Sequence, residues 1–181
     1  MSSVIKVDQI QLADGSTPTA ADLGLNTSGS VIQVVHQGAY VDVVGTGSFD
    51  VFSFSITPRY ISSKVLIIVN FQFSTLDTSG NEFGFIIKRN GSEIASSGQS
   101  NGLLIPGSGV DGAGNLNQYA NFFRSATVLD TPASTSSTTY TLAKKQLNGS
   151  ANVRVGQNGY NSTGTENNFG QSMMTLMEIA G

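Results

Sequence analysis

Cysteine is absent from this chain of 181 residues. Disulfide bonds and thiolate metal sites are therefore excluded, and a stable fold is expected to rely on a large core or on association between copies. Histidine is nearly absent, and a single histidine, His36, without cysteine cannot build a zinc site. A Ser-His-Asp triad would need His36 as its base. The alternating sequence around His36, which shares parity with Ile32 and Val34, instead favours a partly buried strand histidine.

Charge is also scarce, because only 12% of the residues are charged and the net charge is −3. No Lys/Arg cluster is available to neutralise phosphates, which argues against a nucleic-acid partner. The basic pair Lys144-Lys145 is expected on a solvated strand face. No apolar run approaches the roughly 20 residues of a membrane-spanning helix, and the alternating N-terminus does not resemble a signal peptide. Synthesis in a cytoplasm is therefore expected, without membrane insertion and without export by the usual route.

What the sequence does contain is the alternation of β-strands. Between Lys64 and Phe73 every odd position is apolar, whereas the even positions are apolar over the first half only. A strand that is apolar on both faces is covered on both sides, so this segment is predicted to be a central strand of a sandwich. Residues 173–180 are apolar at both parities and are predicted to be central too. The off-parity residues of the two strands are predicted to be buried between subunits: Leu66, Ile68, Met174 and Leu176.

Turn signals separate the other expected strands. Residues 31–37 and 40–44 are expected as two strands split by Gly38-Ala39. In the strand 49–57 the apolar parity changes after Val51, which predicts a β-bulge. The dipeptide Asn90-Gly91 between apolar runs predicts a type I′ hairpin. Short strands at regular spacing, roughly nine or ten of them, predict an all-β fold, an antiparallel jelly-roll β-sandwich over residues 30–181.

The first 29 residues are predicted to form a separate segment. Residues 4–12 alternate apolar and polar side chains, but one short strand cannot fold by itself and must add to a sheet elsewhere. Thr17 as N-cap and Pro18 at the first helical position predict one helical turn that Gly24 ends. Residues 26–30 are small and polar, as in a linker.

Two long polar segments, residues 97–118 and 156–168, are predicted to be exposed loops. In the second, Tyr160 stands among amides, an arrangement with which proteins stack on and hydrogen-bond to sugars or peptides. Tyr160, Asn158 and Asn161 are therefore the expected contacts to a saccharide or protein partner. The alternative is a tyrosine packed under its own loop.

The sequence contains little that points to catalytic or cofactor chemistry. The G-x-G-x-x-G pattern at residues 107–112 is not followed by a helical pattern, which favours a flexible loop over a dinucleotide site. Asp77 with Glu82, or Asp111 with Asn115, could supply oxygens to Ca²⁺, but their spacing matches no calcium loop, and turn capping by Asp and Asn explains them better. No carboxylate pair stands out for glycoside hydrolysis. No cofactor, metal or catalytic residue is predicted.

Several segments carry a resemblance to one family. They are V-I-K-V-D-Q-I-Q-L-A-D-G-S at the start, G-S-V-I-Q-V-V-H-Q, I-S-S-K-V-L-I-I-V-N, L-D-T-P-A-S-T-S-S-T-T-Y-T-L, and T-L-M-E-I-A-G at the end. Together they resemble the small virion fibre and tail-fibre proteins of aquatic bacteriophages, including cyanophages.

The resemblance implies a compact homotrimeric β-sandwich, similar to the C1q/tumour-necrosis-factor jelly roll. It also implies that residues 1–29 join another virion protein and that the far end faces outward. The leading interpretation is a non-enzymatic tail fibre that contacts the host surface through its distal loops. A head fibre or capsid decoration protein with a purely structural role is the alternative, and a polysaccharide-degrading enzyme is a third.

Overall fold

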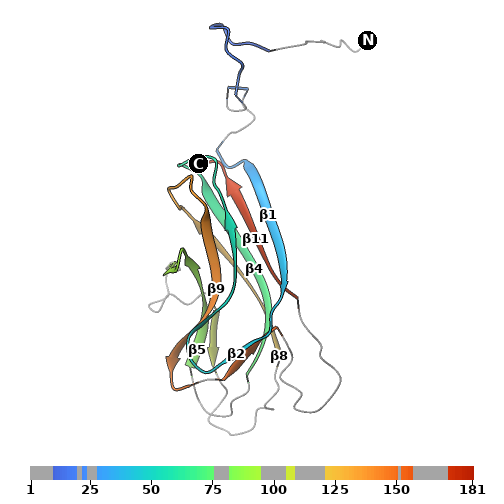
Figure 1. Cartoon of the computed structure of the whole chain (residues 1–181), viewed down its shortest axis with the longest axis vertical. Helices are drawn as coiled ribbons and strands as arrows, with labels where there is room; N and C mark the ends of the chain where they lie inside the picture. Colours follow the sequence, from blue (N-terminus) through green and yellow to red (C-terminus); the bar gives the residue numbers. More distant parts are fainter. Residues whose placement is uncertain are drawn as a thin grey trace, which may run out of the picture.

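The computed structural model describes residues 10–19, 22–23, 28–75, 82–94, 105–108, 121–150, 152–156 and 171–181. This part of the chain is all-β, with two antiparallel sheets packed face to face (Figure 1). The strands are β1 (Val31–Tyr40), β2 (Val43–Gly45), β3 (Phe49–Ile56), β4 (Lys64–Thr75), β5 (Glu82–Arg89), β6 (Ser92–Glu93), β7 (Ile105–Ser108), β8 (Asn121–Asp130), β9 (Thr138–Asn148), β10 (Val153–Val155) and β11 (Gln171–Ile179).

The first sheet is built around β4, as its two-faced apolar sequence predicts. Strand β8 pairs with β4 along one edge. Strands β11 and β10 share the other edge, β11 over residues 64–70 and β10 over residues 73–75. Strands β1 and β2 complete the sheet beyond β11 and β10 respectively. Strand β11, also predicted to be central, lies between β1 and β4.

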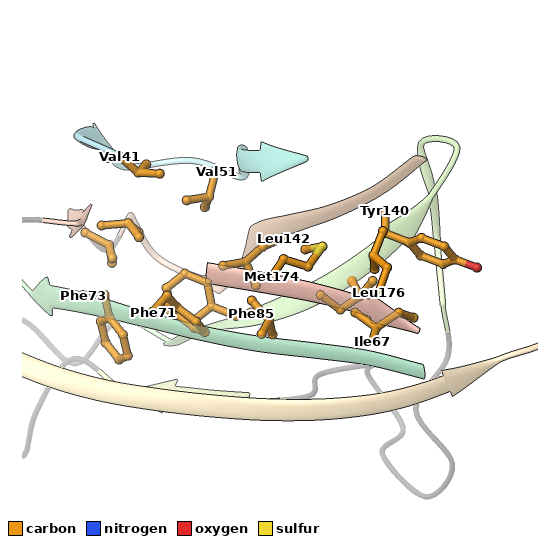
Figure 2. Packing of buried hydrophobic residues seen from close by; sticks show 14 of the residues in the cluster. Val41, Val51, Ile67, Phe71, Phe73, Phe85, Tyr140, Leu142, Met174 and Leu176 are labelled. Carbon is orange, nitrogen blue, oxygen red and sulfur yellow. The ribbon is translucent and has the colours of Figure 1, made fainter. Parts of the chain in front are cut away.

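The second sheet has the order β3-β9-β5, and the outer edge of β5 pairs with both β7 and β6. Its inner face meets the odd-numbered row of β4 in one continuous core. Phe71 and Phe73 of β4 interleave with Phe83 and Phe85 of β5, and the Phe71 and Phe85 ring centroids are 4.6 Å apart at an edge-to-face angle. Figure 2 shows Phe71, Phe73 and Phe85 in this core together with Tyr140 and Leu142 of β9. Such aromatic pairs add about 0.5–1.5 kcal/mol each beyond the area that they bury.

Two local predictions are confirmed. The pairing of β3 with β9 shifts register between Asp50 and Phe52, so Val51 is the extra residue of a bulge and its side chain is buried. The hairpin turn after β5 has Asn90 at φ 48° and Gly91 at φ 83°. Positive φ at both central residues is what a type I′ turn requires.

Other local predictions are wrong. Gly38-Ala39 does not split a strand, because both residues lie within β1 and pair with Met173 and Ser172. Residues 105–108, expected in a long loop, form β7. This strand escaped the sequence pattern because it contains proline and glycine, which edge strands tolerate.

The N-terminal helical turn is not found as a helix in the described residues, which place Asp22 and Leu23 in a turn. Thr19, not Thr17, makes the capping contacts: its backbone N donates to Asp22 Oδ2 at 2.8 Å, and Asp22 N donates to its Oγ1 at 3.3 Å. Residues 1–9, which hold most of the expected first strand, lie outside the described residues. Residues 10–12 are exposed and are not in a strand.

Candidate interaction surface

The outer face of the first sheet is the surface on which the sequence and the structure converge. Because side chains alternate along a strand, burying the odd row of β4 turns Leu66, Ile68 and Asn70 outward. In β11 the inward residues are even-numbered, so Met173, Thr175 and Met177 face outward and are half-buried.

One apolar residue from each of four strands meets on this face in a single line. Val34 pairs with Met177, Met177 with Leu66, and Leu66 with Leu129. Val34 is 52% exposed and Leu129 is 56% exposed. We call these four residues the apolar row. Cross-strand neighbours at this spacing present a continuous surface, and covering each side chain fully is worth roughly 1.5–3 kcal/mol.

The face becomes polar away from the apolar row. The next line of paired residues contains His36, Thr175, Ile68 and Thr127. The line after it contains Gly38, Met173, Asn70 and Ser125. His36 is exposed, not partly buried as expected, and its Nδ1 lies 2.8 Å from Thr175 Oγ1.

A hollow of about 560 Å³ lies at the polar end of the face, between β8 and β11. It is lined by Asn70, Phe71, Phe123, Arg124, Ser125, Gln171 and Met173. No acidic side chain is among its described lining residues.

The structure places the four residues predicted to lie between subunits on two different faces of the first sheet. Leu66 and Ile68 lie on the outer face, whereas Met174 and Leu176 are buried in the core of one chain, beside Leu142 and Ile67 in Figure 2. The prediction for Met174 and Leu176 is wrong because the odd positions of β11 are the more apolar on average. Glu178 is even-numbered like Met174 and Leu176, and its charge makes this buried face of β11 look exposed in the sequence.

Val34, Met177 and Leu129 were missed as members of the face. The spacing along one strand cannot reveal them, since only the register between strands brings them into line. Tyr160, Asn158 and Asn161 lie outside the described residues, so their role in recognition stays a prediction.

Glu178 is fully buried at one end of the sandwich and has several donors. Its Oε1 accepts hydrogen bonds from Arg59 N at 2.7 Å, from Ser63 Oγ at 2.7 Å and from Tyr60 N at 3.3 Å. Its Oε2 accepts from Gln33 Nε2 at 2.6 Å. Burial by itself would raise the pKa of the Glu178 carboxyl, but the hydrogen bonds together lower the pKa below its ordinary value.

Lys144 is buried as well, which contradicts the solvated face expected for Lys144-Lys145. Its Nζ donates to Thr46 O, Gly47 O and Gln146 Oε1 at 2.6–3.0 Å. Burial lowers the pKa of the Lys144 amine to about 8. Lys145 remains at the surface, where its Nζ lies 2.6 Å from Glu93 Oε2.

A third polar group joins the two sheets. Asp130, at the end of β8, accepts from Arg89 Nη1 of β5 at 3.0 Å and from the Tyr140 hydroxyl of β9 at 2.7 Å. Burial and the neighbouring Asp130 carboxylate raise the pKa of Tyr140. These contacts join β8 to the second sheet.

The described residues contain no cluster of three or more His, Asp or Glu side chains that could hold a metal ion. The described part of the chain also contains no helix that is long and apolar enough to cross a membrane. Within the G-x-G-x-x-G pattern, Gly107 and Ser108 belong to β7 and the remaining positions lie outside the described residues.

No family model matches the chain, and no curated protein matches it in sequence. Among solved structures, it is similar to a chain in the structure of the infectious bursal disease virus Gx strain, with 16% identity and a TM-score of 0.39. The match covers 97% of this chain and 38% of the viral chain, so the protein spans well under half of its neighbour's length. A likeness of this degree is too distant to carry an inference about function.

Proposed function

We propose that this protein is a non-enzymatic structural subunit of a bacteriophage virion, a tail-fibre protein that assembles as a homotrimer. The virion and the trimer come from the resemblance of its sequence segments to phage fibre proteins. The apolar row is the structural observation that supports assembly. A cysteine-free chain with four apolar side chains aligned on an outer sheet face gains stability when another copy covers them.

The strand order supports the finer description as a jelly roll. Without the short strands β2, β6 and β10, the six-stranded and five-stranded sheets have the orders β1-β11-β4-β8 and β3-β9-β5-β7. Strands adjacent in sequence mostly lie in opposite layers. The first strand, β1, pairs with the last strand, β11. This wrapping is the pattern of two Greek keys that an eight-stranded jelly roll contains.

The apolar row is the part of the trimer proposal that mutation can test. Replacing Leu66 or Leu129 with Asp places a charge in the proposed contact, where burial without a partner is costly. Sedimentation is expected to show a trimer for the original chain and a folded monomer for Leu66→Asp and Leu129→Asp. Val44→Asp is the matched control, because Val44 is 57% exposed on β2 and lies outside the row.

A stable monomer of the original chain at micromolar concentration would contradict the assembly. The virion itself is tested separately by antibody labelling of phage particles in negative-stain images. Label at the tail supports the fibre, label at the head supports a head fibre or decoration protein, and no label on any particle rejects the virion role.

Recognition of the host through the distal loops is also part of the proposal. Tyr160, with Asn158 and Asn161, remains the proposed contact, and several copies on one particle would raise a weak affinity by avidity. We expect Tyr160→Ala to reduce adsorption of the phage to host cells. Unchanged adsorption by particles that carry the folded variant would remove Tyr160 from the contact.

A further inference from the structure

We infer that protonation of His36 weakens the contact between copies of this chain, so that assembly on the outer face of the first sheet is sensitive to mild acid. The inference rests on the proposed function, because it takes a second copy of the chain as the occupant of that face. His36 is the only histidine in the sequence. Histidine is the side chain that ordinarily changes its charge between about pH 5 and 8.

His36 lies beside the apolar row on the same face. It is two residues from Val34 on β1, so the two side chains point to the same side of the strand. Across the sheet His36 pairs with Thr175, next to Met177 of the apolar row. His36 is exposed in the single chain. A copy that covers Val34 and Met177 therefore comes close to the imidazole ring.

The ring keeps its place on the face in either charge state. Its Nδ1 lies 2.8 Å from Thr175 Oγ1. The hydroxyl group of Thr175 can donate to a neutral ring nitrogen and accept from a protonated one, so gaining a proton does not break this contact. The free-energy cost of the new charge falls instead on the contact between copies, where water is removed from the imidazolium.

The outer face offers nothing that offsets a charge on His36. Among the described outward-facing residues of β1, β11, β4 and β8, only His36 and Lys64 can carry a charge, and both are basic. A face that meets a copy of itself brings like charges together, which is costly. This nearly neutral face is therefore suited to self-association while His36 is neutral, and protonation adds one positive charge from every copy.

The carboxylates nearest in the fold are already paired. Strand β3 approaches the free edge of β1, and its charged residue, Asp50, lies 2.6 Å from Lys88 Nζ. The described carboxylates on or beside the strands of the first sheet each have donors of their own: Asp42, Asp130 and Glu178. Asp130 and Glu178 also share the inner parity of their strands, on the opposite side from His36. Within the described residues, a protonated His36 thus finds no carboxylate that is free to neutralise it.

Sedimentation of the full-length protein over a concentration series tests the inference at about pH 7 and about pH 5.5. Separate copies bind protons more readily than the assembly does, so lowering the pH favours the separate copies. The concentration at which half of the original chain is trimeric is expected to rise by up to roughly 20-fold at the lower pH. His36→Gln is expected to stay trimeric at both pH values, because glutamine can hydrogen-bond to Thr175 and gains no charge.

A second variant carries the charge permanently. His36→Lys is expected to be a folded monomer at both pH values. Val44→Lys is the matched control, because it adds the same charge at a residue that is 57% exposed on β2 and lies outside the face, and it is expected to behave like the original chain. Both pH values lie below the titration of Lys144, whose pKa burial lowers to about 8.

The outcomes separate this inference from the proposed trimer. An original chain that is equally trimeric at both pH values would overturn the inference and leave the trimer intact. The same holds if His36→Gln weakens with acid as much as the original chain, or if His36→Lys still forms the trimer. A monomer under all conditions would overturn the trimer and the inference together. Circular dichroism of the same samples reports the fold, and unfolding at the lower pH would also overturn the inference, since the acid response would not then belong to the contact between copies.

Discussion

The Glu178 carboxylate holds together three parts of the chain at one end of the sandwich. It lies on β11, and its donors come from β1 and from the connection that precedes β4. A buried carboxylate is tolerated only when its oxygens are paired, so each donor is part of the reason that the connection adopts one conformation. Because Glu178 is charged and still lies on the buried face of β11, the alternation of polar and apolar residues does not reveal from the sequence which face of β11 is buried.

We predict that Glu178→Gln destabilises the protein by about 1.5–3 kcal/mol near neutral pH, because a charged acceptor is replaced by an amide that offers a donor to existing donors. Glu93→Gln is the control, and loss of its exposed pair with Lys145 should cost about 0–1 kcal/mol. Urea unfolding at fixed protein concentration measures both. Equal, small losses for the two variants would show that the buried hydrogen bonds contribute little.

The pH dependence follows from the lowered pKa of Glu178. A carboxyl group whose pKa is lower in the folded state contributes stability that is complete above its unfolded pKa, near 4.5, and that is lost as the pH falls through the folded value. We therefore expect the original chain to lose part of its stability below about pH 4.5, and Glu178→Gln to lose less over the same interval. Parallel stability curves for the two proteins in this acid range would contradict the assignment.

At the scale of elements, turn chemistry determines the β5–β6 hairpin more firmly than side-chain packing does. Asn90 N donates to Thr139 O at 2.8 Å, and Asn90 Oδ1 accepts from Thr139 N at 2.8 Å, so the turn is also tied to β9. Gly91 has φ 83°, and a Cβ atom at that position would meet nothing within 4 Å. The need for glycine there is therefore conformational and not steric.

We predict that Gly91→Ala lowers the free energy of unfolding by about 1–2 kcal/mol, the cost of left-handed backbone for an L-residue. Gly47→Ala provides the control: a Cβ atom at Gly47 also meets nothing, and its φ lies outside the left-handed region. That substitution should be neutral or stabilising by about 0.4–1 kcal/mol. Chemical unfolding of the two variants side by side tests the difference, and equal effects would refute the conformational explanation.

Sequence alone predicts these elements where the signal is local. The parity change at Val51 predicts the bulge, and Asn90-Gly91 predicts the turn, because each depends on a few adjacent residues. The prediction of which face of β11 is buried fails because Glu178 and Ser172 lie on the inner face. Their burial depends on groups far away in the sequence. Similarly, the apolar row and the hollow are properties of register across β1, β11, β4 and β8, and no single strand contains them.

At the scale of the whole molecule, backbone hydrogen bonds join the end of the N-terminal segment to the C-terminal end of the sandwich. Gly29 N donates to Ala180 O at 2.8 Å, and Ala180 N donates to Ser30 O at 2.8 Å. In Figure 1 residues 10–19 lie beyond this end of the sandwich, which also carries the C-terminus. Ile10, Leu12 and Leu23 are exposed there, and exposed apolar side chains on a short segment are suited to a partner.

The proposed attachment of residues 1–29 to another virion protein leads to a prediction about two truncations. Deleting residues 1–27 is expected to leave a folded trimer that no longer enters phage particles, because the two hydrogen bonds to Ala180 are kept. Deleting residues 1–30 is expected to be less stable, by about 0.5–1.5 kcal/mol for each lost hydrogen bond. Sedimentation and thermal unfolding test the fold, and immunoblotting of purified particles tests incorporation. If the protein without residues 1–27 fails to fold, those residues are part of the core. If it folds and still enters particles, the attachment lies on the sandwich itself.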